Sequence, residues 1–358
     1  MTARLKQAQQ RLRELNLDGY LVNHLPHIRY LCGFSGSNAL LLLGHRGAEF
    51  YTDGRYKQQI QTEVKGAHKF VPSDGNLLAQ TAQSPIVRSG RPRIGYQAKY
   101  MTVATWHALS RQLEGKALLV AADGLVEPLT EVKDATELKL IERAVRIVDR
   151  AFARILREVR PGVRESEVAA RLEYIMLGLG SEGTAFETIC ASGPRSALPH
   201  GRASRKKIEK GDFVTLDYGA TVGGYCSDIT RTVVVGKATV RQKKIYAVVH
   251  KAQTAAIRKI KPGASTRRVD WAARAIITRA GFGSKFGHGT GHGIGLEVHQ
   301  SPGLSARTEA RLLPGMVVTV EPGIYVPGFG GVRIEDDVLV TRSGHRILTG
   351  APKGLIEL

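Results

Sequence analysis

The chain has 358 residues, of which 42% are hydrophobic and 23% are charged. This length exceeds the usual size of one hydrophobic core, so two domains are expected, and the composition excludes a disordered chain. A formal net charge of +20 would suit a nucleic-acid partner. The basic residues are scattered along the sequence, however, with their densest group at residues 202–210. A basic surface is therefore the favoured interpretation, and nucleic-acid binding is the less favoured one.

The N-terminal residues lack the apolar core of a signal peptide, and no apolar run reaches the ~18–20 residues of a membrane span. Cys32, Cys190 and Cys226 form neither a disulfide framework nor a Cys-x-x-Cys metal pair. Three isolated cysteines suit a reducing compartment. We therefore expect a cytoplasmic protein that has no membrane association.

Residues 1–124 are typical of a small α/β domain. Residues 6–15 have the apolar spacing of a helix. Short apolar segments predict strands at residues 20–22, 39–43 and 49–52. Residues 123–129 are the expected linker, and a second domain is expected over residues 130–358.

The second domain contains two helix pairs, each with a Pro-Gly turn between its helices. Apolar residues at 3–4 spacing predict a long first helix that Thr136 can cap. The turn at residues 160–162 ends this helix, and a second helix begins near Glu165. The same order recurs with a helix over residues 241–260, a turn at 261–263 and a helix from Thr266. The sequence therefore predicts an internal duplication.

Each copy then carries one acid at the end of an apolar, β-branched strand and a second acid beyond a glycine turn. Asp217 and Asp228 occupy these places in the first copy, and Glu321 and Glu335 occupy them in the second. An isolated acid would more often be solvated or ion-paired, but these lie among core residues, where an unpaired carboxylate is costly. Four converging carboxylates repel one another unless cations lie between them. The duplication therefore predicts a metal site.

Three histidines, His288, His292 and His299, lie within twelve residues among glycines that permit close backbone approach. One imidazole added to four carboxylates makes an oxygen-rich site. Such a site favours Mn²⁺, with Co²⁺, Fe²⁺ or Zn²⁺ as possible substitutes. Because two such ions can activate water and polarise a carbonyl, the pattern favours amide hydrolysis.

A known family has metal ligands in this pattern. The pita-bread metallopeptidases of family M24, which include methionine aminopeptidase, aminopeptidase P and prolidase, resemble this chain at Asp217, Asp228, His292, Glu321 and Glu335. The strings GHGIGLEVH, EPGIY and GVRIED look like the Xaa-Pro branch of the family and begin at Gly291, Glu321 and Gly331. Residues 28–36 and 51–56 look like the creatinase-type N-terminal domain. The resemblance implies an α+β protein whose C-terminal pita-bread domain has a pseudo-twofold duplication and follows a smaller creatinase-type α/β domain.

The resemblance also implies a role for each ligand. Asp217 would bind one of two divalent metal ions, and Asp228 and Glu335 would bridge them. His292 and Glu321 would complete the shell of the other ion. Glu321 would also accept a proton from the attacking water.

Four further residues match family positions around the metals. His200 would lie near the substrate amide, and His299 would stabilise the tetrahedral oxyanion. His288 would line the pocket for the proline-side residue, and Arg333 would orient a ligand carboxylate. Gln300 follows His299 where relatives usually carry an acid, so we expect an altered local charge without loss of activity.

The favoured function is a dinuclear exopeptidase that hydrolyses the Xaa-Pro bond at the N-terminus of proline-containing peptides, as aminopeptidase P does. The alternative is a prolidase restricted to Xaa-Pro dipeptides. Arg307 lies where some prolidases place an arginine that could bind the substrate carboxylate, although a solvated loop arginine is an equal interpretation. A non-catalytic nucleic-acid-binding or protein-binding module is opposed by the complete ligand set. Relatives lead us to expect a homodimer.

Overall fold

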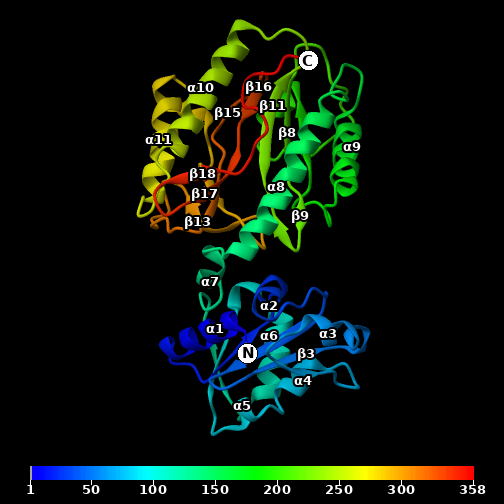
Figure 1. Ribbon diagram of the computed structural model, residues 1–358, viewed down its shortest axis with the longest axis vertical. Coiled ribbons are helices and arrows are strands. Elements are labelled where there is room, and N and C mark those ends of the chain that lie inside the picture. Colours follow the sequence, from blue (N-terminus) through cyan, green and yellow to red (C-terminus); the bar gives the residue numbers. More distant parts are fainter. Residues whose placement is uncertain (1) are drawn as a thin grey trace. The chain divides into compact units, whose positions relative to one another are not determined.

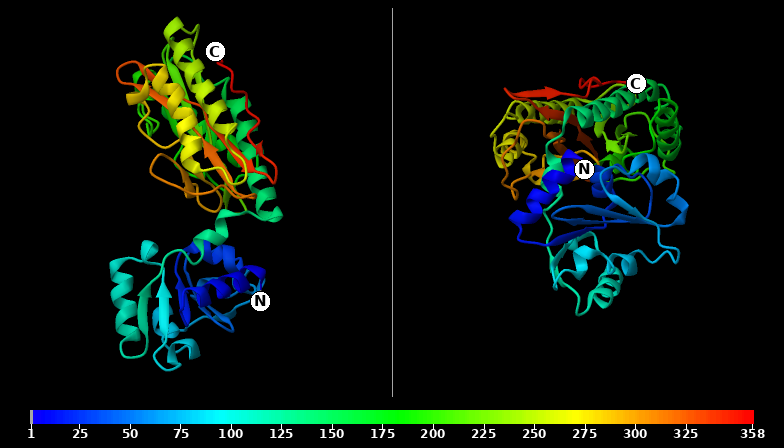
Figure 2. Two further views of the ribbon diagram at one scale, coloured as in Figure 1. Left: turned by 90° about the vertical axis from the view of Figure 1, so that its left-hand side faces the viewer. Right: turned by 60° about the horizontal axis from the view of Figure 1, so that its bottom comes forward.

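The computed structural model describes residues 2–358. The chain divides into two compact units, Met1–Thr130 and Glu131–Leu358, which are drawn in Figures 1 and 2. It passes from one unit to the next within a short helix, α7 (Glu127–Glu131), which overlaps the linker expected at residues 123–129. Within residues 2–358, no helix combines the length and the apolar character that a membrane crossing requires.

The N-terminal unit is built on one mixed sheet in the order β4-β3-β2-β1-β5-β6. Its strands are β1 (Gly19–Val22), β2 (Ala39–Gly44), β3 (Ala48–Thr52), β4 (His68–Phe70), β5 (Arg93–Tyr96) and β6 (Leu118–Ala121). The first three strands pair in antiparallel fashion, and the other neighbours pair in parallel. The three strands predicted in this region are confirmed.

The same unit has α1 (Ala3–Glu14), α2 (Leu25–Cys32), α3 (Gln59–Glu63), α4 (Leu77–Thr81), α5 (Pro85–Arg88) and α6 (Val103–Leu113), with 3₁₀ turns η1 (Gly54–Tyr56) and η2 (Ala98–Tyr100). Thr2 caps α1 by accepting a hydrogen bond from the backbone N–H of Leu5. Leu5 and Leu12 lie on the buried face of α1, which fixes this helix to the unit. The helix predicted over residues 6–15 is therefore confirmed.

The C-terminal unit has four long helices, α8 (Ala135–Ile155), α9 (Glu165–Gly178), α10 (Val240–Ile257) and α11 (Thr266–Arg279). Figure 1 shows α10 and α11 grouped at one side of the strands and α8 and α9 at the other. The predicted helix pairs are confirmed, but the predicted cap of the first helix is wrong. Asp134 caps α8 by accepting from Thr136 and Glu137, and Glu137 accepts the backbone N–H of Asp134 in return. An acid three residues after the cap completes this box, which leaves Thr136 inside the first turn.

The strands of this unit repeat one arrangement. The three-stranded sheet β11-β8-β7 matches the segment β17-β14-β12 of the five-stranded sheet β13-β12-β14-β17-β18, and all these pairs are antiparallel. The strands are β7 (Ile189–Ser192), β8 (Phe213–Tyr218), β11 (Ile229–Val234), β12 (Gly291–Gly293), β13 (Gln300–Leu304), β14 (Val317–Val320), β17 (Asp336–Val340) and β18 (His345–Ile347). Two hairpins, β9 (Thr221–Val222) with β10 (Tyr225–Cys226) and β15 (Gly323–Val326) with β16 (Gly330–Arg333), complete the set, with 3₁₀ turns η3 (Gly193–Ala197) and η4 (Gly283–Lys285).

The two halves of the duplication meet where β11 runs beside the end of β16. The backbone N–H of Glu335 donates to the carbonyl oxygen of Thr230 at 3.1 Å, and the hydroxyl of Thr230 donates to Oε2 of Glu335 at 2.6 Å. The hydroxyl of Thr232 donates to the carbonyl oxygen of Arg333 at 3.0 Å. These bonds satisfy polar groups at the junction and bring acids from both halves together.

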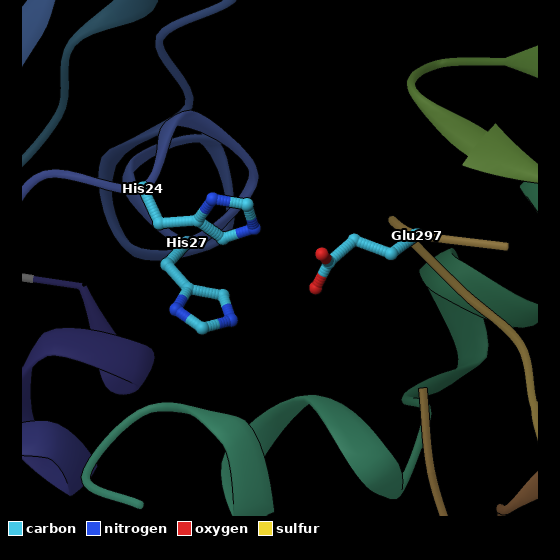
Figure 3. Close-up of side chains that lie close together, drawn as sticks. All are labelled: His24, His27 and Glu297. Carbon is cyan, nitrogen blue, oxygen red and sulfur yellow. The ribbon is translucent and has the colours of Figure 1, made fainter. Parts of the chain in front are cut away.

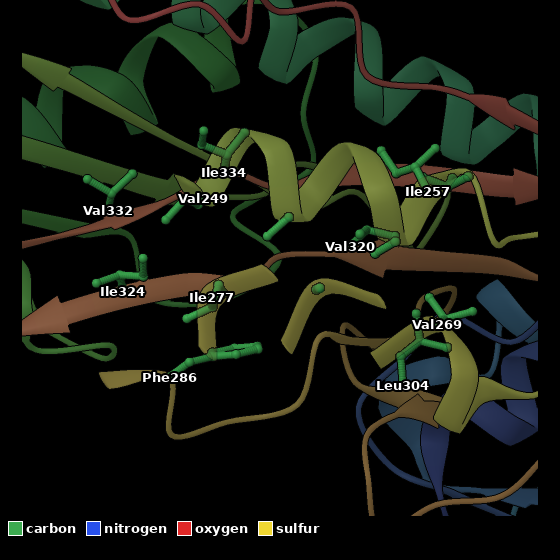
Figure 4. Packing of buried hydrophobic residues seen from close by; sticks show 14 of the residues in the cluster. Val249, Ile257, Val269, Ile277, Phe286, Leu304, Val320, Ile324, Val332 and Ile334 are labelled. Atoms are coloured by element: carbon green, nitrogen blue, oxygen red, sulfur yellow. The ribbon is translucent and has the colours of Figure 1, made fainter. Parts of the chain in front are cut away.

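Each half has its own hydrophobic core. In the second half, apolar side chains of α10 and α11, such as Val249 and Ile277, pack against Val320 and Ile324 of the strands, as Figure 4 shows. These side chains are fully buried, and each contributes roughly 1.5–3 kcal/mol relative to exposure. The first half has the corresponding core between α8, α9 and the strands β8 and β11. The apolar faces that these cores bury hold the acid-bearing strand ends in fixed positions.

Candidate active site

The five side chains predicted as metal ligands all line one cavity of about 520 Å³ in the C-terminal unit. Asp217 lies on β8, and Asp228 directly precedes β11. His292 is the middle residue of β12, Glu321 follows β14, and Glu335 lies between β16 and β17. The ladder between β8 and β11 and the ladder between β14 and β17 thus deliver acids from both halves to one place. Their role as ligands stays a prediction.

The imidazole of His292 lies near two of the acids, Asp228 and Glu321. Its Nε2 atom is 3.4 Å from Oε1 of Glu321 and 3.7 Å from Oδ2 of Asp228. One ligand atom each from Asp228, His292 and Glu335 lie within 4.8 Å of one another, a separation that suits a shared cation. Gly291 allows β12, which carries His292, to lie close to β14, because a Cβ on Gly291 would overlap the backbone oxygen of Thr319 on β14.

The tautomer of His292 follows from its backbone contact. Its Nδ1 atom lies 3.0 Å from the carbonyl oxygen of Gly293, and a carbonyl can only accept, so Nδ1 carries the proton. The lone pair of Nε2 therefore faces the acids. Burial lowers the pKa of His292, which keeps the ring neutral near pH 7. A neutral imidazole with a free lone pair is the form that binds a metal ion.

The carboxyl groups strongly disfavour one another's ionisation. Burial, and then the charges of Glu335 and Asp217, raise the pKa of Asp228 well above its usual value. Burial and the neighbouring acids also raise the pKa of Glu335, and burial raises that of Glu321 although His288 and Arg333 oppose it. The buried Oδ1 atom of Asp228 has no hydrogen-bond partner in the described chain. A divalent cation would offset this repulsion and contact the unpaired oxygen, so the donor set fits a metal site.

Arg333 lies against Asp217, as an orienting residue would. Its Nη2 atom donates to Oδ2 of Asp217, and Nε donates to the hydroxyl of Thr230 at 3.0 Å. Its Nη1 atom donates to the hydroxyl of Tyr325 at 2.8 Å and to the carbonyl oxygen of Pro199 at 3.1 Å. Burial alone would lower the pKa of Arg333, but Tyr325 and the neighbouring carboxylates raise it well above its usual value. The guanidinium therefore stays charged and fully engaged.

Tyr325 had no predicted role, although its hydroxyl joins Arg333 to the predicted pocket residue His288. Nδ1 of His288 lies 2.7 Å from the carbonyl oxygen of Gly289 and must carry the proton, so Nε2 accepts from the Tyr325 hydroxyl at 2.9 Å. Burial raises the pKa of Tyr325 to about 12, which keeps the hydroxyl protonated. Its place four residues after Glu321, at the end of the EPGIY string, was the available signal.

His200 and His299 also line the cavity. His200 follows η3, and His299 directly precedes β13. The rings of His299 and His292 have centroids 4.4 Å apart and meet edge to face. Burial lowers the pKa of His299, and the nearby His292 and His200 lower it further. His299 is thus neutral near pH 7 beside the acid cluster, while its roles in catalysis, and those of His200, stay predictions.

The structure does not bring Arg307 to this cavity. Arg307 is exposed in the segment after β13, where its backbone N–H donates to the hydroxyl of Ser305 at 3.2 Å. Two charged residues that were not predicted to belong to the site, Glu187 and Arg202, do line the cavity. Only the position of Arg202, two residues after His200, could have drawn attention to it.

A partly buried ion pair holds the segment that carries His288. Asp270 of α11 accepts hydrogen bonds from the Thr290 backbone at 3.2 Å and hydroxyl at 2.8 Å. Arg274, paired with Asp270 at 2.9 Å, donates to the carbonyl oxygens of His288 at 2.8 Å and Phe286 at 3.1 Å. This network fixes the glycine-rich chain at the edge of the cavity.

Two histidines of the N-terminal unit form a separate group. His24 precedes α2 and His27 lies within it, and their ring centroids are 4.7 Å apart (Figure 3). The ring of His24 stacks on Tyr100 at 3.7 Å, and Nδ1 of His27 is 2.6 Å from Nε2 of Gln97. These contacts pack α2 against the segment after β5. Glu297 in the same figure belongs to the C-terminal unit.

Comparisons with known proteins match both units. Residues 139–342 match the model of metallopeptidase family M24, and residues 4–132 match the creatinase/prolidase N-terminal domain. An uncharacterized peptidase of Bacillus subtilis, YqhT, is 45% identical over 99% of this chain and 100% of its own length.

Two solved structures extend the likeness to the whole fold. A structure titled as an Xaa-Pro dipeptidase from Bacillus anthracis has a TM-score of 0.95 at 42% identity and covers 99% of both chains. A structure titled as an X-Pro aminopeptidase from Thermotoga maritima has a TM-score of 0.89 at 35% identity and covers 98% of this chain and 100% of its own. The predicted fold class, a creatinase-type domain followed by a pita-bread domain, is confirmed. The chain therefore belongs to metallopeptidase family M24.

Proposed function

We propose that this protein is a dinuclear metal-dependent Xaa-Pro dipeptidase. The observation that carries the proposal is the single cavity that five candidate ligands and three further histidines line together. Full-length likeness to the dipeptidase structure supports the choice of substrate, because identity and TM-score are both higher than for the aminopeptidase structure.

The candidate ligands divide between two ions as the family resemblance implies. Asp217, Asp228 and Glu335 would hold one ion, and Asp228, His292, Glu321 and Glu335 would hold the other. Four carboxylates and one imidazole favour Mn²⁺, with Co²⁺, Fe²⁺ or Zn²⁺ as substitutes. When bound, the divalent ions polarise the scissile carbonyl and promote the ionisation of water at neutral pH.

The side chains of the cavity supply the proton transfers. Glu321 lines the cavity beside His292 and is the group proposed to accept a proton from water. An Xaa-Pro bond has a tertiary amide nitrogen, which must gain a proton as it leaves. His200 and His299 line the same cavity and are the groups proposed to stabilise the oxyanion and to assist the leaving nitrogen. Arg333 donates to Asp217 and would orient its carboxylate toward a bound ion.

The test is hydrolysis of a matched peptide panel by the purified full-length protein. Gly-Pro should be cleaved with Mn²⁺ present, activity should be lost after EDTA treatment, and Mn²⁺ should restore it. Gly-Ala should be a poor substrate. Absence of stoichiometric metal together with absence of Gly-Pro hydrolysis would contradict the proposal and favour a binding module.

The second candidate function is an Xaa-Pro aminopeptidase that acts on longer peptides. The position of Arg307 outside the cavity favours this function, because the arginine predicted to select dipeptides is not at the site. Turnover of Arg-Pro-Pro at a rate equal to or above that of Gly-Pro would establish it. The expected homodimer is part of the proposal and is tested by sedimentation equilibrium of the same preparation. Cytoplasmic location is also proposed, and cell fractionation tests it.

A further inference from the structure

Glu187 and Arg202 form an ion pair at the edge of the catalytic cavity. The Nε atom of Arg202 lies 2.8 Å from Oε2 of Glu187, and both residues line the cavity. The side chain of Arg202 is 78% exposed, and that of Glu187 is 57% exposed. Exposed ion pairs are weak, so a stronger partner can replace either member at little cost.

The backbone of Arg202 is held firmly although its side chain is exposed. Its carbonyl oxygen accepts from Nη2 of Arg195 at 2.7 Å, and Arg195 is paired at 3.0 Å with the fully buried Glu165. Its N–H donates to the carbonyl oxygen of His200 at 3.0 Å. The guanidinium is therefore a solvent-exposed group on a well-held backbone beside the predicted catalytic histidine.

The strand pairing gives the distance of the Arg202 backbone from the acids. Arg202 pairs with Ile189 in an isolated antiparallel bridge, and Ile189 pairs with Asp217 across β7 and β8. Two neighbouring strand spacings place the backbone of Arg202 roughly 10 Å from that of Asp217. An extended dipeptide spans roughly 7 Å. An arginine at this position can reach the far end of a dipeptide whose scissile bond lies at the acids.

No other cation that lines the cavity in residues 2–358 has an accessible guanidinium. Arg333 is buried, and its three nitrogen atoms donate to Asp217, Tyr325, Thr230 and the backbone of Pro199. Arg307 is not among the residues that line the cavity.

We propose that Arg202 binds the C-terminal carboxylate of the substrate and thereby selects short peptides with a free carboxylate after proline. Glu187 holds the guanidinium at the cavity edge and gives it up when substrate enters. A planar guanidinium binds a carboxylate through two parallel hydrogen bonds, which makes the exchange favourable. The proposal rests on the proposed Xaa-Pro dipeptidase function and adds the group that determines its substrate length.

The test compares Gly-Pro with Gly-Pro-amide, which has the same scissile bond but no carboxylate. Wild type should prefer the acid. Arg202→Gln should raise KM for Gly-Pro about tenfold or more with little change in kcat, because a charge-assisted contact is lost, and should leave KM for the amide unchanged. Arg202→Lys should restore part of the preference. Arg205→Gln, an exposed neighbour that does not line the cavity, is the matched control for a lost positive charge.

A second pair of variants separates this assignment from its rival. Glu187→Gln should lower KM for Gly-Pro, and the double variant Glu187→Gln/Arg202→Gln should behave like Arg202→Gln alone. Loss of acid preference in Arg307→Gln but not in Arg202→Gln would overturn the assignment, as would equal changes for acid and amide in Arg202→Gln. If wild type cleaves both substrates with equal KM, this inference fails while the peptidase function stands. If wild type with Mn²⁺ cleaves neither, the proposed function itself fails.

Discussion

Arg231 of β11 and Asp336 of β17 form an ion pair that links the two halves of the catalytic unit. The Nη2 atom of Arg231 is 2.8 Å from Oδ1 of Asp336, and the side chains are 1% and 0% exposed. Arg231 also donates to the carbonyl oxygens of Glu335 and of Ala351 and Pro352 near the C-terminus. One buried side chain thus contacts both strands of the junction and the terminal segment that closes it.

Arg231→Met should lower the free energy of unfolding by about 3–5 kcal/mol, because the buried carboxylate of Asp336 keeps only Lys353 and Gln253 as partners and several carbonyl groups lose their donor. Urea unfolding monitored by fluorescence gives the value. Arg346→Met, which breaks the exposed pair with Glu142, should change it by less than about 1 kcal/mol. Equal effects of the two substitutions would contradict the importance of the buried pair.

Asp228→Asn should stabilise the metal-free protein at pH 7. The folded pKa of Asp228 is raised, so its contribution to stability is present below the unfolded pKa and is lost as pH rises through the folded value. The advantage of Asp228→Asn in EDTA should therefore be largest near neutral pH and should shrink on acidification.

The same variant should respond differently to Mn²⁺. Wild type should gain about 2.7 kcal/mol at a metal concentration one hundred times Kd, and Asp228→Asn should gain much less. Thermal unfolding with EDTA and with Mn²⁺ measures both effects. A wild-type protein that EDTA stabilises would refute the metal assignment.

Asp270→Asn should lower kcat about tenfold to a hundredfold, because it weakens the pair with Arg274 that positions the segment from Phe286 to Thr290. Glu309→Gln breaks the exposed ion pair between Glu309 and Arg267, which lies on α11 as Asp270 does. This control should leave kcat unchanged. Steady-state kinetics on Gly-Pro and metal content should be measured together. A fall in thermal stability without a change in kcat would limit Asp270 to a structural role.

Lys133 should make stability rise with pH in the alkaline range. Burial lowers the pKa of Lys133 from 10.5 to about 8, so the unfolded chain binds more protons between these values. The free energy of unfolding should rise across this window by up to about 3 kcal/mol. Lys133→Met should be the more stable protein at pH 7.5, and its advantage should fall by pH 9.5. Lys139→Met, exposed on α8, is the matched control and should show no such trend.

The sequence was sufficient for features that depend on periodicity and repetition. The apolar stripes of α8 and α10 and the β-branched runs of β8 and β14 report directly on which faces are buried. Because both copies place acids at equivalent strand ends, the five candidate ligands could be grouped before their geometry was known. The glycines around the three histidines also predicted close backbone contact. Gly291 is one of them, since only glycine permits β12 to approach β14 so closely.

Features that depend on which distant segments meet could not be predicted. The contact between Tyr325 and His288 joins residues 37 positions apart, and neither element reveals its partner in its own pattern. Arg202 gained its place at the cavity edge from a single bridge to Ile189. Arg307 matches the place of an arginine in some prolidases, but the loop after β13 carries it away from the cavity.

The division of the candidate ligands between the two halves has a consequence for how the protein loses metal. Asp217 and Asp228 precede α10, whereas His292, Glu321 and Glu335 follow it, so neither half alone offers a complete coordination shell. Separation of β11 from β16 would divide the candidate shell, and hydrogen exchange at the Glu335 amide, which donates to Thr230 across this junction, would report that separation. A bound ion that contacts both halves should therefore slow exchange at this amide.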